Sequence, residues 1–254
     1  MKSKFLVLSI IAFNLFSFTL VYATPSTTYW TPDTSDIQPY RVVHITYDNY
    51  VTHDSSFPAD YGLTVGVLPF EKLQMEVGYD MLMPTNKDKW LQDGSYFNAK
   101  IGSPEGALFE NSPAWNIGIF NVGFTEDKTD YDIMDVIIGK TLPWNLGRVH
   151  LGGYYGLTAT LQKTATGGDG DRGGFMIAYD KGFFPVKDDK GEFNRFVLAA
   201  DYATGKNAIG GGGVGLYVYF TRDISLLTGP VWFNDSDLNG DLKWTLQLDV
   251  NFKF

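Results

Sequence analysis

The last thirteen residues of the chain alternate between apolar and polar side chains. Apolar residues occupy every second position, namely Leu242, Trp244, Leu246, Leu248, Val250, Phe252 and Phe254. This period of two is that of a β-strand with one apolar and one polar face. Strands of soluble proteins are seldom so long, whereas about 9–11 residues of a tilted strand cross the apolar core of a membrane. The segment therefore predicts a transmembrane barrel strand, and an edge strand of a soluble sandwich is the alternative.

The same alternation recurs along the chain between polar links. It predicts strands at residues 40–49, 61–68, 73–83, 96–101, 114–124, 132–142, 148–158, 175–181, 196–202, 214–220, 224–233 and 242–254. Ile119 and Phe120 break the phase of the fifth strand, which indicates a β-bulge. Short links such as 69–72 and 143–145 alternate with longer polar ones. The sequence thus predicts an all-β fold, an antiparallel up-and-down transmembrane barrel of about twelve strands whose first and last strands pair.

The first residues have another pattern. Lys2 and Lys4 precede an apolar run over 5–20, and Val21-Tyr22-Ala23 ends it with a small residue. This predicts a secretory signal peptide over 1–23, while a membrane anchor is disfavoured because Asn14 interrupts a short run. Residues 24–39 are rich in Thr, Ser, Pro and Asp and show no period, so we expect a periplasmic tail before a barrel over 40–254. Tyr29 and Trp30 could instead dock this tail at or inside the barrel mouth.

The composition agrees with a barrel and disfavours one class of partner, nucleic acid. The chain has 28 glycines, 16% aromatic residues and no cysteine, so closure of the sheet rather than disulfides must hold an exported chain together. Its net charge of −9 disfavours binding to nucleic acid, which needs a basic face.

Aromatic residues gather near the predicted strand ends. Those expected beside long loops are Tyr47, Tyr79, Tyr155, Tyr179, Tyr202 and Trp232. Those expected beside short turns are Phe70, Trp144, Phe183, Phe184 and Phe252. Two such belts are typical of membrane barrels, whose aromatic rings sit at headgroup level.

The terminal strand also carries a family resemblance. Its alternating Trp244, Leu246, Leu248, Val250 and Phe252, followed by a final Phe254, resembles the C-terminal signal of bacterial outer-membrane β-barrel proteins. The resemblance implies a location in the outer membrane of a Gram-negative bacterium, with outer-membrane lipid and the barrel-assembly machinery as partners. The resemblance indicates the location and the architecture of the protein, but it does not indicate which solute the protein would carry.

Polar residues in phase with the inner face are the candidate lumen lining. They are His44, Asp48, Glu76, Asp80, Lys100, Asp135, Arg148, His150, Asp180, Asp201 and Asp249. Carboxylates outnumber cations among them, so a water-filled lumen would favour small polar or cationic solutes. We therefore predict a small porin or channel. The alternative is a structural or adhesive barrel with a plugged lumen and acidic external loops, because a barrel of this size lies between filled and open ones.

Lipid hydrolysis and calcium binding are two further functions that a barrel of this kind could have. An outer-membrane lipid hydrolase would need a His and a Ser on the lipid-facing wall, and none of the strands shows that spacing, so we predict no enzyme. The loop Asp235, Asp237, Asn239 and Asp241 matches the opening of a calcium loop, but Leu246 stands where a bidentate Glu belongs. Calcium is thus a weak expectation, and no other cofactor is expected.

Overall fold

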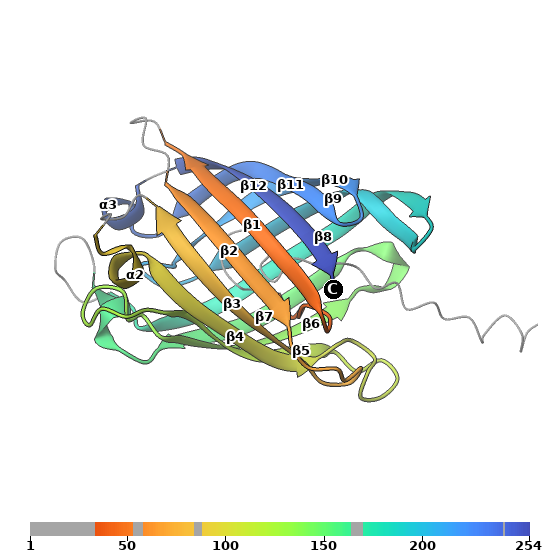
Figure 1. Ribbon diagram of the computed structural model, residues 1–254, viewed down its shortest axis with the longest axis horizontal. Coiled ribbons are helices and arrows are strands. Elements are labelled where there is room, and N and C mark those ends of the chain that lie inside the picture. Colours follow the sequence, from red (N-terminus) through yellow and green to blue (C-terminus); the bar gives the residue numbers. More distant parts are fainter. Residues whose placement is uncertain (1–33, 53–57, 84–87, 164–169, 241) are drawn as a thin grey trace, which may run out of the picture.

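The computed structural model describes residues 34–52, 58–83, 88–163, 170–240 and 242–254. Twelve antiparallel strands form a closed barrel in which each strand pairs with its neighbours in sequence, and β1 pairs with β12 (Figure 1). The predicted signal peptide and the first part of the predicted tail, 24–33, lie outside the described residues. None of the described helices is long and apolar enough to cross a membrane.

The strands keep the predicted order, with somewhat different ends. They are β1 (Val42–Val51), β2 (Ala59–Gly66), β3 (Gln74–Met83), β4 (Ser95–Ser103), β5 (Ala114–Val122), β6 (Ile133–Thr141), β7 (Arg148–Gly156), β8 (Gly173–Asp188), β9 (Gly191–Ala203), β10 (Gly211–Thr221), β11 (Ile224–Phe233) and β12 (Leu242–Lys253). Short helical turns join some of them: α2 (Trp90–Asp93), η1 (Pro143–Asn145), η2 (Ala159–Gln162) and α3 (Ser236–Asn239).

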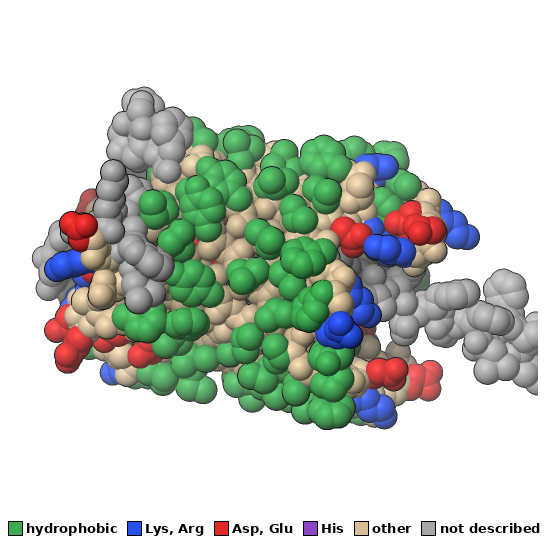
Figure 2. Space-filling view, viewed as in Figure 1, with side chains coloured by type: hydrophobic (Ala, Val, Ile, Leu, Met, Phe, Trp, Pro, Cys, Tyr) green, Lys and Arg blue, Asp and Glu red, His purple; other side chains and the backbone are tan. Residues whose placement is uncertain are grey.

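The terminal strand closes the cylinder as predicted. In the seam between β1 and β12, Thr46 lies opposite Asp249 and Asp48 lies opposite Gln247. The alternation sets which side chains face out, because Trp244 is 51% exposed while its neighbour Thr245 is fully buried. Figure 2 shows hydrophobic side chains covering the barrel wall, with charged groups gathered at its two ends. An apolar surface of this extent suits lipid contact and not water.

The connections define two ends of the barrel. The turn end carries the connections over 67–73, 104–113, 142–147, 189–190 and 222–223, and the loop end carries α2, η2, α3 and the remaining connections. Both the C-terminus and Tyr40, which bridges to Gly66 at the start of the barrel, lie at the turn end (Figure 1).

Three local predictions can be compared with the structure. The bulge in β5 is confirmed, since Phe97 and Ala99 pair with Val122 and Ile119, so that β5 has one residue more than β4 over this stretch. The predicted strand ends at 181 and 196 are wrong, because β8 and β9 continue to a two-residue turn at 189–190. Tyr179 was expected beside a long loop, yet it pairs with Val149 and donates a hydrogen bond to the Leu146 carbonyl at the turn end.

Candidate functional site

Two hollows of the barrel interior are lined by described residues. The loop-end hollow has a volume of about 360 Å³ and is lined mainly by β1 to β5. The turn-end hollow has a volume of about 780 Å³ and is lined by turn residues, by the start of β7 and by residues 35–39. No residue lines both of them. A solute crossing this part of the barrel would therefore meet two chambers and the side chains that divide them.

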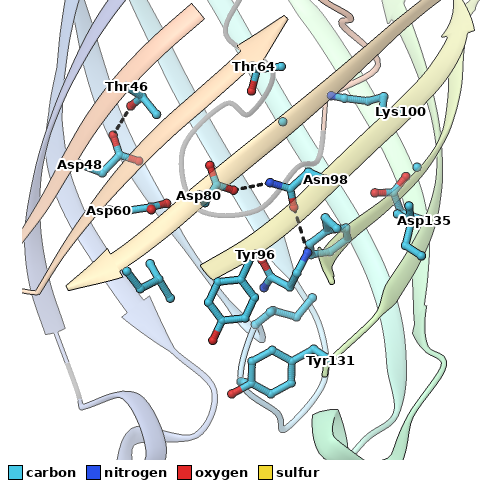
Figure 3. A pocket seen from close by; sticks show the side chains of 18 of the residues that line it. Thr46, Asp48, Asp60, Thr64, Asp80, Tyr96, Asn98, Lys100, Tyr131 and Asp135 are labelled. Carbon is cyan, nitrogen blue, oxygen red and sulfur yellow. Dashed lines mark hydrogen bonds between the residues drawn. The ribbon is translucent and has the colours of Figure 1, made fainter. Parts of the chain in front are cut away.

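Carboxylates dominate the loop-end hollow (Figure 3). Asp48, Asp60 and Asp80 project from β1, β2 and β3 close to one another, and Asp135 lies farther across the hollow. Asp48 and Asp60 stand directly opposite each other in the β1–β2 register. Like charges placed in this way destabilise a sheet. This arrangement of carboxylates therefore lowers the stability of the fold.

Glycines on the inner face make room for two of these groups. A Cβ atom at Gly62 would lie 2.8 Å from Asp80 Oδ1, and one at Gly118 would lie 2.8 Å from Asp135 Oδ1. Each carboxylate therefore lies flat across a glycine of the neighbouring strand. Had those positions carried side chains, the hollow would be filled and the acids displaced.

The hydrogen bonds of these acids come from neutral groups. Thr46 donates its hydroxyl to Asp48 at 2.5 Å, and the Asn98 amide donates to Asp80. Oδ1 of Asp60 and Oδ1 of Asp135 accept no hydrogen bond from the described residues. Within the described part of the chain, none of these four aspartates forms an ion pair.

Cations in the hollow are few. Five lining carboxylates face two lysines and one histidine among the described residues. Lys100 lies 3.6 Å from Glu76, and His44 Nε2 lies 3.5 Å from Asp249 on β12. The net balance of the lining is therefore acidic.

Beside the acids the lining is apolar and aromatic, because Tyr96 lies opposite Asp80 in the β3–β4 register. Phe120 and Ile209 are buried there, and the rings of Tyr96 and Tyr131 stack with centroids 6.3 Å apart and planes 6° from parallel. Burial raises the pKa of the Tyr131 hydroxyl, so this loop residue stays neutral at physiological pH. The loop-end hollow consequently has an anionic side and an apolar side.

The turn end is occupied by the chain's own N-terminal segment, residues 34–38. Thr34, Ser35 and Gln38 are buried inside the barrel, although the sequence predicted a periplasmic tail for this stretch. The Asn116 side-chain amide donates to the Thr34 carbonyl at 2.9 Å, and the backbone N–H of Gln38 donates to the Glu76 carboxylate at 2.6 Å. Together with the Glu76–Lys100 pair, the segment lies between the two hollows.

One arginine is the main anchor of that segment. Arg148 donates two hydrogen bonds to Asp36, at 2.8 and 2.9 Å, and lies 3.0 Å from Asp180. Burial acts to raise the pKa of Asp36, but the charge and hydrogen bonds of Arg148 outweigh it, so that this pKa lies below its ordinary value. Asp36 thus stays ionised and paired.

Ser35, His150 and Asp180 form a hydrogen-bonded chain that resembles a hydrolytic triad in composition only. His150 Nδ1 lies 3.1 Å from the Ser35 hydroxyl, but it also accepts the backbone N–H of Ser35 at 3.0 Å. Its Nε2 lies 3.2 Å from Asp180. Because that backbone donor already uses the Nδ1 lone pair, the ring cannot serve as a base for the hydroxyl. The group anchors the segment, and it faces the interior and not the lipid.

The predicted lining residues all project inward, in distinct groups. His44, Asp48, Glu76, Asp80, Lys100 and Asp135 line the loop-end hollow. Arg148, His150 and Asp180 hold the N-terminal segment. Asp249 pairs with His44, and Asp201 is buried on the inner face of β9 without lining either hollow.

One lining acid was missing from the prediction. Asp60 lies just before the predicted start of its strand, although it is in phase with the inward-facing Thr64. Starting the predicted strand one residue earlier would have included it. The far side of the interior is also less polar than expected, because buried Ile137, Met176 and Leu227 fill it along β6, β8 and β11.

The calcium expectation stays a prediction. Asp235, Asp237 and Asn239 lie at and within α3, and Asp241 lies outside the described residues. The described part of the chain contains no group of three or more His, Asp or Glu side chains arranged to hold a metal ion.

The chain is similar to several solved outer-membrane proteins, at low identity. No protein-family model and no curated protein matches the chain. Among solved structures, an outer-membrane channel from Pseudomonas putida F1 is 11% identical, with a TM-score of 0.49, covering 91% of this chain and all of the other. The NanC porin is 10% identical with a TM-score of 0.49, covering 84% of this chain and 100% of its own. A mutant of a Rh. blastica porin is 11% identical with a TM-score of 0.41, and the 76% of this chain that aligns spans only 55% of that porin. At this degree of likeness, function has to be argued from the barrel's own geometry.

Proposed function

We propose that this protein is an outer-membrane channel of small conductance that favours cationic solutes. One observation carries the proposal: the loop-end hollow holds five carboxylates against two lysines and one histidine among its described lining residues. Acidic walls of low dielectric constant concentrate cations and repel anions. The apolar outer wall, the aromatic strand ends and the terminal Phe254 support insertion into the outer membrane by the barrel-assembly machinery.

The N-terminal segment sets the size of the pathway. Residues 34–38 and the Glu76–Lys100 pair lie between the two hollows, so solutes cross only beside the segment or when it shifts. A low unitary conductance follows from this arrangement.

Planar bilayers test the proposal directly. Under a KCl gradient, the wild-type barrel should give a reversal potential of the sign expected for cation preference. The triple variant Asp48→Asn, Asp60→Asn, Asp80→Asn should shift it toward zero, because it removes three negative charges from the hollow. The control Asp223→Asn alters an exposed carboxylate in the β10–β11 turn and should leave the potential unchanged. Anion preference, or equal potentials for the wild type and the triple variant, would contradict the acidic selectivity.

A plugged structural barrel is the second candidate. The observation that favours it is the anchoring of residues 34–38 by Arg148, His150, Asn116 and Glu76. Reconstituted protein that is folded yet silent in bilayers, and that remains silent when Asp36 and Arg148 are both neutralised, would support this candidate over the channel.

A further inference from the structure

We propose that the loop-end hollow is a binding site for a small organic cation that joins an ammonium group to an apolar, preferably aromatic, body. This deepens the proposed channel function and rests on it, since it names the class of solute. The inference comes from the two unlike walls of one hollow, which an inorganic cation would not use.

Three aspartates form the acidic side of the hollow. Asp48 and Asp60 are directly opposite in register, and Asp80 projects beside them from the next strand (Figure 3). The described residues give these three no ion pair, although neighbouring Glu76 has Lys100. A cation from outside would relieve the repulsion, and binding energy would follow from that relief.

A second observation points independently to a ligand. Asp135 is only 3% exposed, lines the hollow, and leaves Oδ1 without a hydrogen bond from the described residues. A buried acceptor without a donor is costly, and a carboxylate can only accept. An ammonium group supplies up to three N–H donors and a positive charge at once.

The apolar and aromatic part of the lining, which begins beside Asp80 at Tyr96, selects the body of the ligand. Phe120, Ile209 and the stacked Tyr96 and Tyr131 present apolar surface and aromatic faces to the same space. A hydrated metal ion gains nothing there, whereas an apolar body leaves water and an ammonium group near a ring face gains a cation–π interaction. The volume of about 360 Å³ is at the lower end for small-molecule sites.

Three probes separate charge from body. Isothermal titration calorimetry on the detergent-solubilised full chain would use 2-phenylethylammonium, methylammonium and 2-phenylethanol. We expect 2-phenylethylammonium to bind at least about tenfold more tightly than either of the others, which each lack one half of it. Equal affinity for 2-phenylethanol would overturn the inference, because the acidic wall would then be irrelevant. Equal affinity for methylammonium would also overturn the inference, because the aromatic side chains would then contribute nothing to binding.

Two variants test whether the acidic and the aromatic side chains each contribute to binding, and a third variant is the control. Asp80→Asn keeps the shape of its side chain and should weaken 2-phenylethylammonium about tenfold. Tyr131→Leu should weaken 2-phenylethylammonium while leaving methylammonium unchanged. Asp223→Asn, an exposed carboxylate in a turn, should match the wild type for every probe. Full affinity in both Asp80→Asn and Tyr131→Leu would refute the site.

The outcome can be distinguished from that of the proposed channel. A cation-selective barrel that binds no 2-phenylethylammonium would refute this inference and leave the channel intact. A barrel that binds the probe but never conducts would refute the channel and leave the site in place.

Discussion

The two ends of the barrel interior use charge in opposite ways. At the turn end, charges meet partners of opposite sign: Arg148 pairs with Asp36 and Asp180, and Lys140 lies 2.7 Å from Glu105. At the loop end, Asp48, Asp60 and Asp80 stand together without an ion pair among the described residues. Paired charges hold a segment of the chain in place, whereas a cluster of carboxylates without ion pairs can bind a cation from outside. In the proposed channel, the turn end would restrict passage and the loop end would select what enters.

The anchor of the turn end can be removed by Arg148→Gln. The variant leaves Asp36 and Asp180 buried together without their cation, so we expect a loss of about 2–3 kcal/mol in the free energy of unfolding, below the cost for a fully buried pair. Urea unfolding of the barrel in detergent measures it. Lys163→Gln breaks an exposed pair with Asp127 and should cost less than about 1 kcal/mol. A similar loss in both variants would mean that Arg148 has no special structural role.

The segment can also be displaced by volume alone. A Cβ atom at Gly139 would overlap the Ser35 hydroxyl and lie 2.6 Å from His150 Nδ1, so Gly139→Val should push residues 34–38 aside. Single-channel conductance should then rise several-fold, because the two hollows become connected. Gly153→Val is the matched control, since a Cβ atom there would meet nothing closer than 3.5 Å. Unchanged conductance in Gly139→Val would show that the segment does not limit passage.

Acid should loosen the same anchor. The pKa of Asp36 is lowered in the folded barrel, so its stabilising effect is complete above about pH 4 and is lost as the pH falls through the lowered pKa. Bilayer conductance of the wild type should therefore increase as the pH falls below about 4. Asp36→Asn should already conduct more at neutral pH and respond less to acid. Parallel acid responses in the two proteins would assign the effect to another group.

The loop end should respond in the opposite sense to neutralisation. Asp60→Asn removes one member of a like-charged cross-strand pair, so the barrel should gain about 0.2–1 kcal/mol of stability. Its thermal unfolding temperature in detergent should rise slightly as a result. A lowered unfolding temperature would indicate that Asp60 has a stabilising partner and that the cluster is not strained.

Prediction from sequence succeeded where the membrane imposes a pattern. Alternation identified the strands, the bulge in β5 and the seam between β1 and β12, because a closed barrel in lipid must keep one face apolar over its whole height. It failed in the β8–β9 hairpin, whose strands extend past their predicted ends at the turn end (Figure 1). Asp60 was missed for a related reason, since it lies near the end of a strand, where apolar and polar residues no longer alternate clearly.

The sequence by itself determined the architecture of this protein: its strands, their order, and which side chains face inward. These features are local, because each depends on neighbours two positions apart in the chain. Only the tertiary structure decided how the inward residues group. Ser35 and His150 are 115 positions apart and meet only once the sheet has closed, as do Gln38 and Glu76. The division of the interior into a paired turn end and an unpaired loop end is thus a property of the closed barrel, in which strand tilt and register set the distances between charges.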